Sequence, residues 1–137
     1  MSTFFGGEQL TDVLTFKNYF TPADNQEFNI YTVPVGSYAL IKRVTLQARA
    51  GATTNYIIEA RHLATDVNEI TGALENFDRS IADAGQTTDA QLNLYNQNAA
   101  SYGNYYLDEG ESIRFHNLGG VNVATAYVVI VHVYKKA

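Results

Sequence analysis

The clearest hydrophobic alternation lies in Glu111–Asn117, where Ile113 and Phe115 share one face and polar or charged side chains occupy the other. A period of two is typical of a strand with one buried and one solvated face. Similar apolar runs, separated by glycine, proline, Asp or Asn turns, predict the other strands. These strands are Val13–Tyr19, Glu27–Val33, Ser37–Ala50, Asn55–Leu63, Gln91–Tyr95 and Val121–Tyr134.

The predicted strand Ser37–Ala50 changes phase in its middle. Ala39 and Ile41 share one face, whereas the apolar residues from Val44 onward fall on the opposite face by strict count. One extra residue resets a period of two, so a β-bulge near Lys42-Arg43 would return both sets to the core. The core predicted from this and the other strands contains Leu14, Phe16, Ile30, Ile41, Val44, Leu46, Ile113, Phe115, Val129 and Val131.

The last predicted strand, Val121–Tyr134, is largely apolar on both faces. A single sandwich core covers only one face of such a strand. We therefore expect the second face to be covered by a helical segment or by another subunit. Depending on the register, the residues toward that partner are Tyr127, or else Val128, Ile130 and Tyr134.

The segment Asp66–Gly85 departs from the strand pattern. Its apolar residues recur at every third or fourth position, which is the periodicity of an amphipathic helix. They are Val67, Ile70, Leu74, Phe77 and Ile81. Asp66 and Glu69 resemble a capping box, and Gly85 is placed to end a helix. The pattern predicts a short helical insertion, with a long loop containing a short strand as the alternative, since an interior Gly72 costs about 1 kcal/mol relative to Ala.

Two glycine-containing stretches predict how the strands connect. Pro34 lacks a backbone donor and Gly36 permits a bend, so the stretch between them is interpreted as a corner between two strands. The stretch Leu118-Gly119-Gly120 predicts a tight hairpin. Together the elements predict an all-β fold, an antiparallel β-sandwich of jelly-roll type with about seven or eight strands and one short helical insertion. Residues 1–9 are expected to form a flexible arm, and residues 10–137 a single β-sandwich domain.

Composition narrows the functional classes. A chain of 137 residues suits one domain, and the absence of cysteine excludes disulfides and thiolate chemistry. The net charge of −5 argues against a nucleic-acid-coating surface. No apolar run approaches the roughly 20 residues of a membrane helix, and the first ten residues lack the pattern of a signal peptide.

Candidate catalytic chemistry is sparse. The three histidines, His62, His116 and His132, lie on different predicted strands, and Glu59 is expected on the opposite face from His62. Asp108, Glu109 and Glu111 cluster at a turn, where solvated carboxylates are the simpler interpretation. No nucleophile, phosphate-binding or zinc-protease motif occurs. We therefore expect no catalytic residues, no metal and no cofactor, and a protein that is not an enzyme.

Candidate partner-binding residues fall in three places. Phe4 and Phe5, before a pair of glycines, form an apolar hook in the arm. The Tyr/Asn-rich segment 95–106 has the composition of a binding loop for a protein or a glycan, although a polar loop anchored by buried rings fits equally well. The last strand supplies the third group. The full set is Phe4, Phe5, Tyr95, Tyr102, Tyr105, Tyr106, Tyr127, Val128, Ile130 and Tyr134.

Two stretches together resemble small β-sandwich virion proteins of tailed bacteriophages. They are IYTVPVGSYALIKRVTLQARAG and, after a long gap, YYLDEGESIRFHNLGGVNVATAYVVIVHV. In this family a strand pair opens the domain, and an L-x-x-G-[DE]-S-I hairpin followed by a long valine-rich strand closes it. The matching positions here are Tyr31–Leu46 and Leu107–Val133, about half of the chain, and the insertion at Asp66–Gly85 lies outside the pattern.

The resemblance implies a structural virion protein assembled in the host cytoplasm. The expected function is a capsid decoration (cement) protein that binds across shell subunits, with a tail accessory protein or a receptor- or glycan-binding knob as the alternative. The expected partners are further copies of the chain, as a homo-oligomer and specifically a trimer, and the major capsid protein or another virion protein. Neither nucleic acid nor a membrane is expected as a partner.

Overall fold

The computed structural model describes residues 3–4, 8–48, 54–64, 67–68, 71–86, 90–92 and 105–137. Within these ranges the chain forms strands and turns, and it has no helix suited to crossing a membrane. The strands are β1 (Thr3–Phe4), β2 (Glu8–Phe20), β3 (Glu27–Thr32), β4 (Ser37–Ala48), β5 (Thr54–His62), β6 (Val67–Asn68), β7 (Ala73–Leu74), β8 (Phe77–Gln86), β9 (Ala90–Leu92), β10 (Tyr105–Leu107), β11 (Ser112–Gly120) and β12 (Thr125–Lys135).

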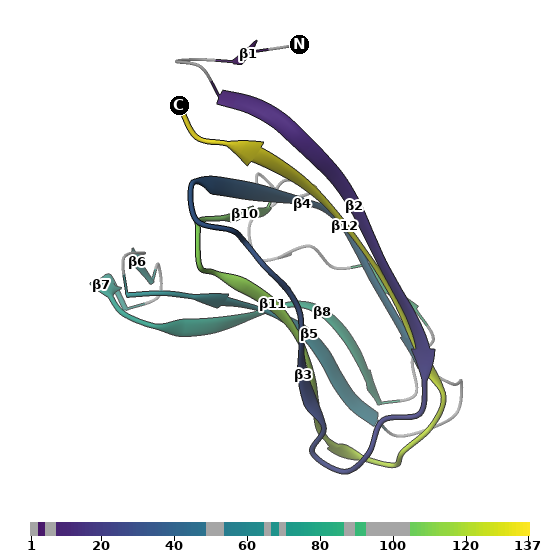
Figure 1. Cartoon of the computed structure of the whole chain (residues 1–137). Helices are drawn as coiled ribbons and strands as arrows, with labels where there is room; N and C mark the ends of the chain where they lie inside the picture. Colours follow the sequence, from purple (N-terminus) through teal and green to yellow (C-terminus); the bar gives the residue numbers. More distant parts are fainter. Residues whose placement is uncertain are drawn as a thin grey trace.

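The strands form two main antiparallel sheets that face each other (Figure 1). Sheet A has the order β1-β2-β12-β4-β10, with β9 also pairing with β4, and sheet B has the order β3-β11-β5-β8. The short strands β6 and β7 pair only with each other. The predicted all-β antiparallel sandwich is therefore confirmed, while its jelly-roll type stays a prediction.

The core lies between the two sheets. Buried residues come from the inward positions of β4 and β12 in sheet A and of β5 and β11 in sheet B. The predicted core residues Ile41, Val44, Leu46, Ile113, Phe115, Val129 and Val131 are fully buried, and Leu14, Phe16 and Ile30 pack against them while partly exposed. The alternation therefore predicted the core, because inward positions repeat every second residue.

The predicted bulge in β4 is confirmed by the pairing of β4 with β12. Arg43 lies opposite Ile130, but Ile41 lies opposite the next residue, Val131, so Lys42 is the extra residue. Both Ile41 and Val44 are buried as a result. The bulge keeps one apolar set toward the core along the whole strand.

The corner interpretation of Pro34–Gly36 is also confirmed. The turn connects β3 of sheet B to β4 of sheet A. Gly36 has a φ of 84°, and the Ser37 amide donates to the Pro34 carbonyl at 3.2 Å. A positive φ at the third position of a turn favours glycine, which explains why position 36 is glycine.

The predicted helix at Asp66–Gly85 is wrong. The described part of the segment contains the hairpin of β6 and β7 and the strand β8, which pairs with β5 along its length. Phe77 and Ile81 are four residues apart, a spacing that places two side chains on one face of a strand as well as on one face of a helix. Pairing with β5 decides between the two, and a register shift adds a bulge at Ile81.

The predicted hairpin at Leu118–Gly120 is wrong as well. β11 belongs to sheet B and β12 to sheet A, so residues 121–124 cross between the layers instead of returning beside β11. The crossing is held by Tyr56, whose hydroxyl donates to the Val121 carbonyl at 2.8 Å and accepts from the Val123 amide at 3.0 Å. This long-range anchor has no local sequence signal.

Candidate interaction surface

The outer face of sheet A is the side of that sheet turned away from sheet B. On β12, Val129 and Val131 point to the core, so Val128, Ile130, His132 and Tyr134 belong to the outer face. Their cross-strand neighbours on this face come from β2 and β4. They include Val13, Thr15, Lys17, Tyr38, Leu40, Arg43 and Thr45.

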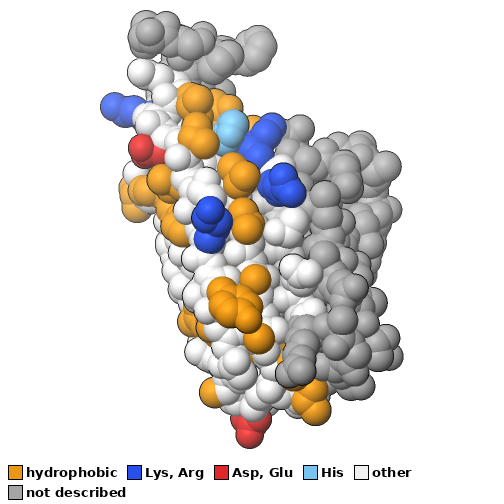
Figure 2. All heavy atoms as spheres, turned by 90° about the vertical axis from the view of Figure 1, so that its right-hand side faces the viewer, with side chains coloured by type: hydrophobic (Ala, Val, Ile, Leu, Met, Phe, Trp, Pro, Cys, Tyr) orange, Lys and Arg blue, Asp and Glu red, His pale blue; other side chains and the backbone are white. Residues whose placement is uncertain are grey.

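This outer face is strongly apolar for a solvent-facing sheet. Figure 2 shows hydrophobic side chains in a broken stripe down the described surface, interspersed with Lys, Arg and one His. Val13 is 58% exposed and Tyr19 is 76% exposed. Val128 and Ile130 are half-buried by their neighbours. The second apolar face predicted for the last strand is therefore present. The helix predicted at Asp66–Gly85, which was one candidate to cover this face, does not form in the described residues.

Three tyrosines stack in a column across β12, β4 and β10. The ring centroids of Tyr134 and Tyr38 are 5.1 Å apart, and those of Tyr38 and Tyr106 are 5.3 Å apart. Stacking at these separations is favourable and fixes the ring orientations. The sequence singled out Tyr106 and Tyr134 but missed Tyr38, although its position one residue before the buried Ala39 already implied an outward side chain.

The two outer faces of the sandwich differ in their carboxylates. Outward positions of β4, β12 and the part of β2 opposite β12 carry Lys17 and Arg43 and no carboxylate. The outer face of sheet B holds Glu27, Glu59 and Asp78 together with Arg61 and Arg114, which pair with Asp78 and Glu27. In a chain with a net charge of −5, the outer face of sheet A is therefore locally cationic as well as apolar.

Two predicted partner-binding residues are instead part of the interior. Tyr127 is buried and packs edge-on against Phe20, because its odd position in β12 points to the core. Tyr105 is buried in β10, and its hydroxyl lies 2.6 Å from His62 Nε2. Neither side chain can contact a partner at the surface of the folded chain.

Tyr105 belongs to a buried polar network that fixes the turn before β11. Glu111 is fully buried, and its carboxylate accepts from the Leu63 amide at 3.0 Å and from the Asp108 amide at 2.7 Å. His62 Nδ1 lies 3.4 Å from the same carboxylate. The interpretation of Glu111 as a solvated turn residue is therefore wrong, since it is a structural acceptor inside the domain.

The remaining predicted partner residues divide by location. Phe4 lies in β1, which pairs with the start of β2 through Thr3 opposite Gln9 and Phe4 opposite Glu8. Phe5, Tyr95 and Tyr102 lie outside the described residues. Val128, Ile130, Tyr106 and Tyr134 are brought together on the outer face of sheet A, which makes this face the best candidate for a functional surface.

Comparison with known structures gives distant likenesses. No family model matches the sequence, and no curated protein matches it. One similar solved structure comes from the work titled "Bacillus endospore appendages form a novel family of disulfide-linked pili", with 14% identity, a TM-score of 0.45, and coverage of 96% of this chain and 93% of that chain. Another is the "Cyanophage Pam1 capsid asymmetric unit", with 11% identity, a TM-score of 0.36, and coverage of 96% and 91%.

Proposed function

We propose that the protein is a non-enzymatic structural component of a phage virion, and specifically a capsid decoration protein that attaches through the outer face of sheet A. The proposal rests on the outer face of sheet A around Val128 and Ile130. This face is apolar and carries cationic side chains, and no layer of the described chain covers it. The strand-corner pattern that resembles small phage virion proteins supports the same class. An exposed contiguous apolar face is typical of an interaction site.

The dimensions of this face correspond to an interface somewhat smaller than the standard size. The eleven residues of β12 extend about 36 Å, and three neighbouring strands are about 14 Å wide. The flat area is therefore roughly 500 Å² before side-chain relief is added, against about 800 Å² per partner in a standard interface. Adhesion would come from burying this area across neighbouring shell subunits, with Lys17 and Arg43 favouring a partner surface that carries carboxylates.

Self-association is part of the same proposal. Closed symmetric assembly covers apolar surface without leaving open ends, and a trimer is the arrangement that the resemblance to small phage virion proteins implies. Sedimentation velocity of the pure chain at micromolar concentration tests it. A species larger than the monomer is predicted, and a monomer over the whole concentration range would contradict self-association.

The location in the particle is tested by mass spectrometry of the purified virions made by the encoding genome. The chain is predicted to be present at a copy number comparable with that of the shell protein. Its absence from purified virions would overturn the virion assignment. A copy number matching that of a tail component would instead support a tail accessory protein.

A receptor- or glycan-binding knob is the alternative, favoured by one observation. The stacked rings of Tyr134, Tyr38 and Tyr106 present an ordered aromatic platform, and such platforms suit sugar or peptide ligands. A glycan array separates the two functions. Binding that is lost in Tyr106→Ala would favour the knob, whereas no binding by the native chain would remove it.

A further inference from the structure

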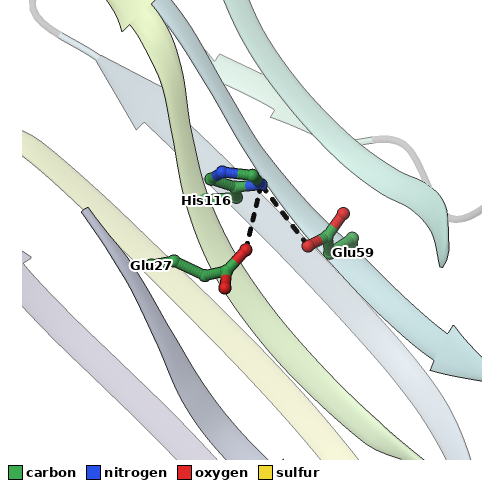
Figure 3. A group of neighbouring side chains, drawn as sticks. All are labelled: Glu27, Glu59 and His116. Atoms are coloured by element: carbon green, nitrogen blue, oxygen red, sulfur yellow. Dashed lines mark ion pairs between the residues drawn. The ribbon is translucent and has the colours of Figure 1, made fainter. Parts of the chain in front are cut away.

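Two glutamates and a histidine meet on the outer face of sheet B, away from the proposed interface. Glu27, Glu59 and His116 come from the neighbouring strands β3, β5 and β11. His116 lies directly opposite Glu27, and Glu59 is displaced along β5. Figure 3 shows both carboxylates directed toward the imidazole ring.

The two separations from His116 match those between the ligands of a bound metal ion. His116 Nδ1 lies 3.3 Å from Glu27 Oε2 and 3.6 Å from Glu59 Oε1. Both exceed the usual N–H···O range of about 2.7–3.2 Å, and one ring nitrogen can donate only one proton. By contrast, ligand atoms bound at about 2.0–2.2 Å in a tetrahedral site lie about 3.3–3.6 Å from one another.

Glu59 provides an independent indication. Only 6% of the residue is exposed, and its carboxylate forms a long ion pair with His116 at 3.6 Å. Burial raises the pKa of Glu59, and the nearby Asp78 carboxylate adds to the effect. A buried carboxylate is normally paired, hydrogen-bonded or bound to a metal, so a cation at this position would remove the cost of its burial.

A neighbouring side chain orients the ligands on one side of the cluster, and solvent reaches the other side. Arg114 forms an ion pair with Glu27 Oε1, which orients that carboxylate and leaves Oε2 directed at His116. Side chains that hold the ligands in this way are characteristic of metal sites. Glu27 and His116 are partly exposed, so water can reach the site and complete the coordination.

We propose that Glu27, Glu59 and His116 bind one divalent metal ion, Zn²⁺. The ion would link strand β3 to β11 and β5. Their donor atoms all lie within 4.8 Å of one another. An imidazole and two carboxylates form a ligand set that Zn²⁺ accepts. The role is structural: the ion would secure the edge strand β3 and neutralise the two carboxylates. The sequence led us to expect no metal, because the three ligands are distant along the chain.

The test uses the untagged full chain after removal of metal with a chelator. Calorimetric titration with Zn²⁺ is expected to give one ion per chain. The melting temperature should rise by several degrees at saturating Zn²⁺, because a ligand that binds only the folded state stabilises it. Absence of zinc binding by the native chain would overturn the proposal.

Variants locate the ion. His116→Ala and Glu59→Gln should each lose the zinc-dependent rise in melting temperature. In chelator, Glu59→Gln should melt at a higher temperature than the native chain, because its buried charge is gone. His132→Ala, which removes a histidine on the outer face of sheet A, should keep the full response. Folding of each variant is checked by circular dichroism. Unchanged zinc affinity in the near-isosteric Glu59→Gln, or loss of binding in His132→Ala, would place the ion elsewhere and overturn the site.

Discussion

Tyr38 and Tyr134 stack almost in parallel across β4 and β12, with ring centroids 5.1 Å apart and 9° between the ring planes. They lie directly opposite each other in the strand ladder, so the contact is a cross-strand aromatic pair. Tyr106 of β10 extends the stack beyond Tyr38. The outer face of sheet A therefore has fixed side chains although no described layer covers it, which is the preorganisation that a binding surface needs.

Tyr38→Ala removes the central ring of this column. Because each stacked pair contributes about 0.5–1.5 kcal/mol beyond its burial, losing two pairs should lower the free energy of unfolding by about 1–3 kcal/mol. Urea denaturation measures the change. Tyr19→Ala, which removes a ring that is 76% exposed, serves as the control and should stay within about 0.5 kcal/mol of the native chain. Equal effects of the two variants would show that the column carries no stability.

Phe115→Ala creates a cavity in the centre of the sandwich. The ring is fully buried and contacts Phe20, Phe28 and Tyr56. A loss of about 3–5 kcal/mol in the free energy of unfolding is expected for such a truncation. A loss below about 1 kcal/mol would contradict the register of β11, since Phe115 would then face solvent.

Glu111→Ala tests the buried acceptor of the turn before β11. The Leu63 and Asp108 amides would lose their partner inside the domain, at about 1–3 kcal/mol for each unsatisfied donor. The expected loss of stability is therefore about 2–6 kcal/mol by chemical denaturation. Glu109→Ala, which breaks only a half-exposed ion pair with Lys136, is the matched control and should change stability by about 0–1 kcal/mol. The reverse order of the two losses would contradict the network.

Alkaline pH should weaken the fold partly through Tyr127. Burial raises the pKa of Tyr127 above its ordinary value of 10.0, so the folded chain holds this proton more tightly than the unfolded chain. The associated stability is present below pH 10 and is lost as the pH rises through the folded pKa. Tyr127→Phe should therefore flatten the fall in melting temperature above pH 10. Tyr19→Phe should leave that fall unchanged, and an equal fall in the native chain and Tyr127→Phe would exclude this origin.

Local pattern predicted much of the fold. The bulge at Lys42 and the corner at Gly36 were both predictable, because a phase change and a proline–glycine turn are features of neighbouring residues. β8 was mistaken for a helix because the four-residue spacing of Phe77 and Ile81 fits both structures. Only pairing with β5 settles the choice.

The sites were less predictable, since they depend on which strands become neighbours. The outward positions of β12 were anticipated from its two apolar faces, but the choice between Tyr127 and Val128 needed the register. Tyr38 joined the column only through the pairing of β4 with β12 and β10. His116 and Glu27 are far apart in sequence and meet because β3 and β11 are adjacent.

The most direct measurement is the binding of the native chain and of Ile130→Glu to virions stripped of the protein, followed by co-sedimentation. Ile130 lies on the outer face of sheet A opposite Thr15 and Arg43, so the variant should fold. Desolvating a carboxylate in the interface costs several kcal/mol even with Arg43 opposite it, so Ile130→Glu should bind at least about 100-fold more weakly. Val35→Glu places the same charge at an 87% exposed position in the corner turn and should bind like the native chain. Native-like binding by Ile130→Glu would contradict attachment through this face.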